Sequence, residues 1–384
     1  MVFICFLLTI LEVSAQDEKE PLIKWPELKG YVKYLSNATS INLPVYEEFL
    51  TNQLIHHRLN LRWDIINNLT IHSGWRNQIF FGEQVKASSD FGQLLLRGQD
   101  DFFNLSTNFI DQNSIVFNST LDRLYAEYYW GDLEISFGRQ RVNWGINTIW
   151  NPNDIFNTFS FVDFDYEERP GSDVGLVRYY FSELGSMEIA AKFHGSKEKM
   201  VVGGLWKLNA YAYDFQILTG YANGYYAFGG GWAGNLGNAG WKGEFTWFVS
   251  DIPEVDNTFL ITSGVDYSFV NGWYISGGFL FNRNGSGSSS ITELVTFNVS
   301  AQNLYPYKYA ILLTNSYPIT PLSSASLTVV YTPNSLHPMF ISPVITYSIA
   351  QDWDLDFTGQ IGMEKNEGYY SPLQAFFLRL KWSY

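Results

Sequence analysis

The sequence predicts an all-β protein: a closed transmembrane antiparallel up-and-down β-barrel of about 18 strands, with 16 as the alternative. Three observations lead to this fold class. Aromatic residues make up 18% of the 384 residues and charged residues only 16%, which is unusual for a soluble protein of this size. After the N-terminus, no run of about 20 apolar residues could form a spanning helix. Segments in which large apolar residues alternate with polar or small ones recur along the chain.

The first 15 residues are expected to be a signal peptide, removed before the barrel forms. A short apolar core is followed by Val13-Ser14-Ala15, which resembles a cleavage site. Residues 16–27 would then be a short periplasmic lead-in. Because Cys5 lies in the signal segment, the mature chain would hold no disulfide, no thiolate metal site and no cysteine nucleophile.

Alternation gives each predicted strand an inward and an outward face. In residues 53–63 the apolar residues fall on one face and the polar and basic residues on the other. The polar face would be the outside of a soluble sandwich but the inside of a membrane barrel. Aromatic residues recur at strand ends, as in an interfacial girdle, and favour the barrel. The barrel must also close, because an open edge in lipid would leave backbone groups unpaired.

Residues 28–384 are expected to form one barrel domain. Gly131-Asp132 is a hairpin signal between two alternating segments. An even strand number places both termini on the periplasmic side, and the two longest connections, near residues 83–114 and 142–172, on the outer surface. Small inward residues such as Gly and Ser favour an open lumen, whereas Tyr125 and Tyr129 favour partial filling.

The last segment, AFFLRLKWSY (375–384), alternates to its end and stops at Tyr384. It resembles the C-terminal signal of bacterial outer-membrane barrels, which is read by the machinery that inserts them. The alternative is an ordinary strand.

Residues 137–157, FGRQRVNWGINTIWNPNDIFN, are the most distinctive stretch, together with EERPGSDVGLVRYYF (167–181). They resemble a mostly uncharacterised group of porin-like outer-membrane proteins of the Bacteroidetes. GYVKY (30–34) and YSIAQDWDLD (347–356) fit the same group. The resemblance implies a barrel in the bacterial outer membrane, but it supplies no substrate and no site residue.

Basic side chains are expected to line one wall of the lumen. By alternation, the inward set is Arg58, Arg62, Arg76, Arg123, Arg178 and Lys192. Arg139 and Arg141 would join it if Gly138 allows a bulge. The opposite charge gathers in the second long loop and its end, at Asp163, Asp165, Glu167, Glu168 and Asp173.

We expect this acidic loop to fold into the lumen and face the basic wall, which makes a constriction whose transverse field orients small polar solutes. Alternatively, the arginines pair with inward glutamates (Glu127, Glu134, Glu188) and only stiffen the wall, or the loop stays outside and binds divalent cations. Trp144 and Trp150 would shape the base of the loop or stack on sugar rings.

The expected function is that of a Gram-negative outer-membrane porin, a channel for passive passage of small polar solutes. The alternative is a closed barrel that serves as an anchor, an adhesin or a partner of an export or assembly complex. A net charge of −14 argues against nucleic acid as a partner. The sequence holds no hydrolase, metalloprotease or phosphate-loop motif, so we expect no enzyme, catalytic residue, metal or cofactor.

The expected partners are outer-membrane lipid and lipopolysaccharide, the barrel-assembly machinery through the strand ending at Tyr384, and small polar solutes. Self-association into a homo-oligomer is left open.

Overall fold

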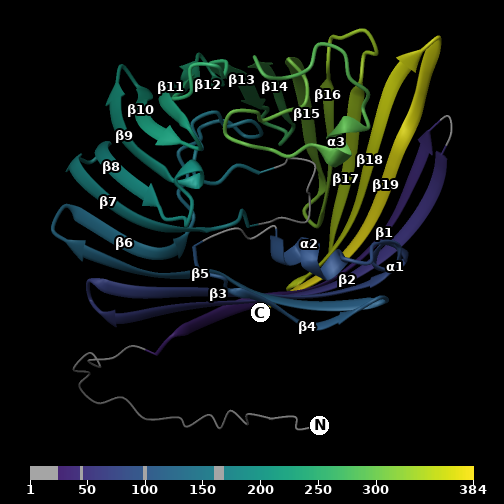
Figure 1. Ribbon diagram of the computed structural model, residues 1–384, viewed down its shortest axis with the longest axis horizontal. Helices are drawn as coiled ribbons and strands as arrows, with labels where there is room; N and C mark the ends of the chain where they lie inside the picture. Colours follow the sequence, from purple (N-terminus) through teal and green to yellow (C-terminus); the bar gives the residue numbers. More distant parts are fainter. Residues whose placement is uncertain (1–24, 44–45, 98–101, 160–167) are drawn as a thin grey trace.

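The computed structural model describes residues 25–43, 46–97, 102–159 and 168–384. Nineteen strands form one antiparallel sheet, which closes on itself because β1 (Glu27–Leu43) pairs with β19 (Gly368–Ser383). Within the described residues, β4 (Ser106–Gln112) pairs with β5 (Ile115–Trp130) alone and stands outside the ring. The ring therefore has 18 strands, and the predicted fold class is confirmed (Figure 1).

Consecutive strands are neighbours around the whole ring. After β1 it continues through β2 (Tyr46–Ile66), β3 (Leu69–Gly82), β5, β6 (Leu133–Gln140), β7 (Ser172–Ser182), β8 (Gly185–Lys192), β9 (Val201–Ala210), β10 (Tyr213–Ala222), β11 (Tyr225–Leu236), β12 (Ala239–Ser250), β13 (Thr258–Ser268), β14 (Tyr274–Asn282), β15 (Tyr309–Thr320), β16 (Ser323–Tyr331), β17 (Met339–Ala350), β18 (Trp353–Asn366) and β19.

One end of the barrel carries tight turns. Gly131 has a φ of 58°, in the left-handed region that a two-residue hairpin turn requires. The long connections lie at the other end and carry short helices: α1 (Glu83–Ala87), α2 (Phe91–Arg97), the 3₁₀ turn η1 (Lys197–Lys199) and α3 (Glu293–Thr296). No helix in the described part of the chain is long and apolar enough to cross a membrane.

The alternation of apolar and polar residues in the sequence corresponds to the outward and inward faces of the barrel wall. On β2, Ile55 is 37% exposed on the outward face, whereas its neighbours His56 and Arg58 are buried on the inward face. On β3, Trp75 points outward and is 52% exposed, while Arg76 is buried. Large apolar side chains dominate the outward face of most strands, as in barrels whose outside meets hydrocarbon.

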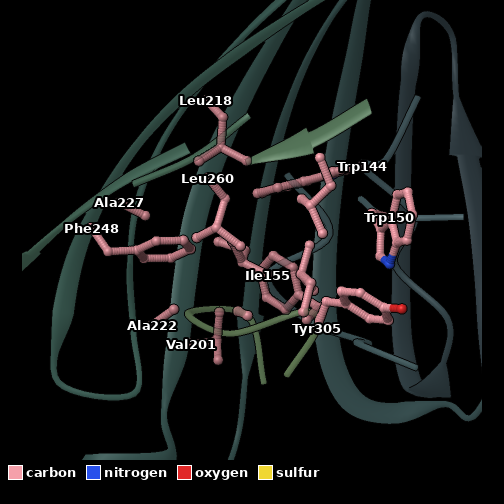
Figure 2. Packing of buried hydrophobic residues seen from close by; sticks show 14 of the residues in the cluster. Trp144, Trp150, Ile155, Val201, Leu218, Ala222, Ala227, Phe248, Leu260 and Tyr305 are labelled. Carbon is pink, nitrogen blue, oxygen red and sulfur yellow. The ribbon is translucent and has the colours of Figure 1, made fainter. Parts of the chain in front are cut away.

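An apolar core lies inside the barrel, which alternation alone does not predict. Two connections fold into the lumen: residues 141–159, here called loop A, and residues 283–308, here called loop B. Figure 2 shows Trp144 and Ile155 of loop A beside Leu218 and Leu260 of the wall. The ring centroids of Trp150 in loop A and Tyr305 in loop B lie 5.4 Å apart. The lumen is therefore partly filled by a packed core along β7 to β17.

Inward glycines on β9 and β11 make room for loop A rather than for open space. A Cβ at Gly203 would lie 2.8 Å from the Trp144 ring, and a Cβ at Gly231 would lie 2.6 Å from Cδ1 of Ile146. Both distances are too short for real carbon atoms. The small inward residues that favour an open lumen on sequence grounds are thus, on these strands, occupied by the loop.

Candidate functional site

Two wall carboxylates fasten loop A. Glu244 on β12 is 0% exposed, and its Oε1 accepts hydrogen bonds from the backbone N–H groups of Ile146 (3.2 Å) and Asn147 (3.0 Å). Its Oε2 accepts a third from the N–H of Asn153 at 3.3 Å. Both carboxyl oxygens therefore accept backbone hydrogen bonds from loop A, which fixes the loop against β12.

Glu188 on β8 holds the start of the same loop. Its Oε2 accepts a hydrogen bond from the indole Nε1 of Trp144 at 2.9 Å, while Lys207 donates to Oε1 at 2.8 Å. Gln216 on β10 adds a bond from Nε2 to the carbonyl oxygen of Trp144 at 2.7 Å. Loop A is thus tied to three separate strands, so its path across the lumen is fixed by the wall.

Asn153 binds the wall through its side chain as well. Its Nδ2 donates to the carbonyl oxygen of Gly230 at 3.0 Å, and its Oδ1 accepts from Oγ1 of Thr246 at 2.7 Å. Together with the contact to Glu244, this makes Asn153 the most fully bonded residue of loop A among those described here.

Loop B is held in the same manner. Glu364 on β18 accepts a hydrogen bond from the N–H of Ile291 at 2.8 Å, and Nε2 of Gln302 donates to the carbonyl oxygen of Ala222 at 2.9 Å. The two loops therefore pack against the inner wall from β7 to β18. On β16 and β17 the inward side chains of Thr328 and Thr346 remain partly exposed.

A basic cavity lies on the inner wall of β1 to β5, near the end with the tight turns. Its volume is about 230 Å³. The cationic side chains that line it are Lys29, Arg58, Arg62 and Arg123, beside His72 and Tyr125 and the carboxylates of Glu27 and Glu168. Three of the six basic residues predicted to line the pore, Arg58, Arg62 and Arg123, thus share one cavity.

Arg58 is largely neutralised where it lies. It is 2% exposed and makes a bidentate pair with Asp122, with 2.8 Å from Nη1 to Oδ2 and 3.1 Å from Nη2 to Oδ1. Glu168, at the end of the second long connection, is a further ion-pair partner of Arg58. Arg62 is more available, because its side chain is 56% exposed and its contact with Asp64 is 3.2 Å.

A bulge explains why Asp122 reaches Arg58. The register between β3 and β5 shifts between Gly74 and Trp75, which pair with Arg123 and Leu121, so that Asp122 is the extra residue. The bulge lets Asp122 and Arg123 both reach the interior, where strict alternation would allow only one. The alternation of the sequence does not predict that Asp122 is the partner of Arg58.

The other predicted residues lie apart from the cavity. Arg178 pairs with Glu134 at 2.8 Å and with Glu188 at 3.1 Å, as in the alternative in which arginines stiffen the wall. Arg76 is buried on β3, and Lys192 ends β8. Asp163, Asp165 and Glu167 lie outside the described residues.

Asp173 differs from its expected place in the constriction loop. It is the second residue of β7 and pairs with Arg139 on β6, at 2.9 Å between Nη2 and Oδ2. The backbone N–H of Phe103 donates to the same carboxylate at 2.8 Å. Gly138, with a φ of 126°, breaks the alternation of β6, so that Arg139 and Gln140 are both buried in succession. Asp173 therefore stabilises the wall.

Asp154 is a titratable group buried in loop A. It is 1% exposed, and burial raises the pKa of its carboxyl group to about 7, although the positive charges of Arg141 and Arg169 act in the opposite direction. The ion-pair contact with Arg169 is 3.7 Å from Nη1 to Oδ2. Arg169 also stacks on the ring of Phe159, and burial lowers its pKa to about 10. Asp154 lines a small cavity between loop A and Leu304 of loop B.

No family model matches the sequence, and neither does any curated protein. The structure is similar to the crystal structure of OccAB4 from Acinetobacter baumannii, with a TM-score of 0.60 and 10% identity over 95% of this chain and 100% of that one. It is also similar to OccK9 (OpdG) from Pseudomonas aeruginosa, with a TM-score of 0.61 and 10% identity over 95% and 99%. For OccK11 (OpdR) of the same organism the TM-score is 0.56, with 9% identity over 93% and 95%.

The chain has the fold of these barrels. At such low identity the likeness concerns the fold, and it assigns no role to any residue of this chain. Among the described residues, no group of three or more His, Cys, Asp or Glu side chains could hold a metal ion.

Proposed function

We propose that the protein is an outer-membrane, porin-like channel through which small polar solutes diffuse. The observation that carries this proposal is a closed ring of 18 strands with a basic cavity of about 230 Å³ on its inner wall, beside loops that fill only part of the lumen. Rings of 16 to 18 strands are wide enough to leave an aqueous channel. The apolar outward face fits a location in the bacterial outer membrane, in contact with lipid and lipopolysaccharide.

The charges of the cavity give the channel its selectivity in this proposal. Arg62, Arg123 and Lys29 line the passage, whereas Arg58 is balanced by Asp122 and Glu168. The contact between Glu168 and Arg58 supports an acidic segment facing a basic wall, and the neighbouring acidic residues of the loop would extend it. Lys29 also pairs with Glu27 at 2.6 Å and Arg62 with Asp64 at 3.2 Å, so the wall presents opposite charges side by side. Such an arrangement orients polar solutes by its local field.

The second candidate is a closed barrel that acts as an anchor, an adhesin or a partner of an export or assembly complex. The apolar core formed by loops A and B favours it, because these loops are fastened and occupy much of the lumen. Neither candidate requires an enzyme, a metal or a cofactor.

Three further features of the proposal rest on the sequence. The resemblance to porin-like proteins of the Bacteroidetes and the signal peptide stay predictions. Recognition of the last strand by the barrel-assembly machinery is also a prediction. Tyr384 and Gly30 exchange two backbone hydrogen bonds of 2.9 Å, so the final residue closes the seam between β19 and β1.

Single-channel recording of the refolded protein in a planar bilayer, with a salt gradient across it, tests the proposal. Stable conductance steps are expected, and the reversal potential shows whether the basic side chains or the carboxylates of the cavity dominate the selectivity. A correctly folded barrel without conductance would overturn the channel and favour the closed-barrel alternative.

A further inference from the structure

A second space in the lumen lies away from the basic cavity, between loop A and the inner wall of β12 to β15. We call it the glycine niche, because Gly264 on β13 is directly opposite Gly278 on β14 in its floor. Both glycines face inward, since Leu260 and Leu280 on the same faces of these strands are buried in the core. The residues around this floor that the argument uses are Asn147, Thr148, Lys242, Asp266, Ser276 and Leu312.

Loop A does not fill the floor of the niche. A Cβ at Gly278 would meet nothing nearer than the Leu312 side chain at 3.6 Å, beyond its chain neighbours. A Cβ at Gly264 would come no closer than 3.3 Å to any such atom. At Gly203 and Gly231, by contrast, side chains of loop A already lie 2.8 Å and 2.6 Å from the same point. The missing side chains of the niche therefore leave space that opens to the lumen.

Two opposite charges stand beside this space without a direct hydrogen bond. Nζ of Lys242 on β12 lies 3.9 Å from Oδ2 of Asp266 on β13, and both side chains are 28% exposed. The Lys242 ammonium instead donates to Oγ1 of Thr148 in loop A at 3.0 Å. A hydroxyl group both donates and accepts, so one placed between the ammonium and the carboxylate satisfies both of them.

A hydroxyl and an amide oxygen complete the polar rim of the niche. Ser276 is directly opposite Asp266, and Oδ1 of Asn147 faces Gly264. The Asn147 amide is held in this orientation, because its Nδ2 donates to Oγ1 of Thr262. Among the described residues, the Ser276 hydroxyl and Oδ1 of Asn147 have no hydrogen-bond partner. Both groups are therefore available to a solute in the niche.

We propose that the glycine niche binds a vicinal pair of hydroxyl groups, as carried by sugars and other neutral polyols. One hydroxyl of the solute accepts a hydrogen bond from Lys242 and donates one to Asp266. The adjacent hydroxyl bonds to Ser276 or to Oδ1 of Asn147, while the carbon atoms rest on the glycine floor and Leu312. This inference rests on the proposed channel function and deepens it by naming a class of solute.

The charges of the niche favour a neutral solute. Lys242 and Asp266 lie side by side, so an anion attracted by the ammonium is repelled by the carboxylate, and a cation meets the reverse. A hydroxyl group meets no such repulsion, and its hydrogen bonds to charged groups are stronger than those to neutral ones. Hydroxyl groups also continue beyond the niche, because Ser276 is opposite Thr314 on β15, which is opposite Thr328 on β16.

Saturation-transfer difference NMR on the folded full chain tests this proposal, with D-glucose as the probe. The detergent must have no sugar head group, since such a head group would compete for the niche. Saturation transfer to glucose is expected. Acetate, an anion, and L-alanine, a zwitterion, should not displace glucose at the same concentration.

Two variants address the niche itself. Gly278→Val should abolish the glucose signal, because the added side chain fills the space without a backbone clash. Asp266→Asn should weaken the affinity for glucose about tenfold or more, because it replaces a charged hydrogen-bond acceptor by a neutral one.

Gly204→Val is the matched control. Gly204 is an outward glycine on β9, and a Cβ there would lie 3.7 Å from the nearest atom beyond its chain neighbours. This variant should bind glucose as the unchanged protein does. Heat-dependent electrophoretic mobility shows that each variant is a folded barrel.

The proposal is overturned if the unchanged barrel gives no glucose signal, or if acetate or L-alanine displaces glucose. It is equally overturned if the affinity survives Gly278→Val or Asp266→Asn. The measurement needs no current through the barrel, so it separates two failures. A barrel that binds glucose but never conducts overturns the channel and leaves the niche, whereas a conducting barrel that binds no glucose overturns the niche alone.

Discussion

The hold of Glu244 on loop A can be tested by one substitution. Glu244→Ala removes the acceptor for three backbone N–H groups, those of Ile146, Asn147 and Asn153. Each donor left unsatisfied in a buried place costs about 1–3 kcal/mol, so the docked loop should lose roughly 3–6 kcal/mol once partial rearrangement is allowed for. The hydrogen bonds of Trp144 and Asn153 to other strands and the apolar core would remain.

Limited proteolysis of the folded barrel measures this loss. When loop opening is fast compared with cleavage, the cleavage rate follows the open population, and 3 kcal/mol corresponds to an increase of about 100-fold. Cleavage within residues 142–157 should therefore be faster by at least about that factor, while the barrel itself stays intact. In single-channel recordings the same variant should show larger and noisier conductance.

The control is Glu127→Gln. Glu127 is an inward carboxylate on β5 that contacts His72 rather than loop A, and it is partly exposed. It should leave the cleavage rate of the loop unchanged. If Glu244→Ala is cleaved no faster than the unchanged protein, the apolar core and the other hydrogen bonds suffice to hold loop A, and the reasoning about the carboxylate is refuted.

Three further perturbations follow from the site. Neutralising Arg62 and Arg123 to Gln should move the reversal potential in a salt gradient toward cation selectivity; an unchanged potential would remove both from the pore lining. Gly203→Val should displace Trp144 and speed cleavage of loop A, because even one Cβ there lies 2.8 Å from the indole ring; cleavage at the unchanged rate would show that the wall yields instead. Asp154 has a pKa of about 7 when buried and an ordinary value of 3.8, so the docked loop binds the extra proton. Docking should therefore weaken by up to about 1.4 kcal/mol per pH unit as pH rises from about 4 to 7, and then level off. Cleavage of loop A should rise over that range, Asp154→Asn should flatten the profile, and an unaltered profile in that variant would exclude Asp154 as the source.

The barrel was predictable because its signal is repeated on every strand. Alternation places His56 and Arg58 inward and Ile55 outward, and the closed ring of 18 strands follows from many such segments. The composition also favoured a membrane barrel, because so low a share of charged residues and so high a share of aromatic residues are unusual in soluble folds.

The contents of the lumen were not predictable in the same way. Glu244 lies in a strand of large aromatic and small residues, and nothing local shows that its partners are N–H groups about a hundred residues earlier. Backbone donors leave no mark in the sequence. The inward glycines of β9 and β11 are ambiguous for the same reason, because a missing side chain can mean either empty space or a loop packed against the wall.

The two places where alternation breaks decide which charges remain free. The bulge at Asp122 brings a carboxylate to Arg58, and Gly138 permits the buried pair of Arg139 with Asp173. By alternation alone, Arg58 would be an unpaired charge in the lumen and Arg139 would face lipid. The two breaks instead give each arginine a carboxylate partner in the wall. The field in the lumen is therefore set by fewer residues than the sequence suggests. Arg62 is the most exposed of the cavity arginines whose partners have been described, and charge selectivity should depend on it more than on Arg58.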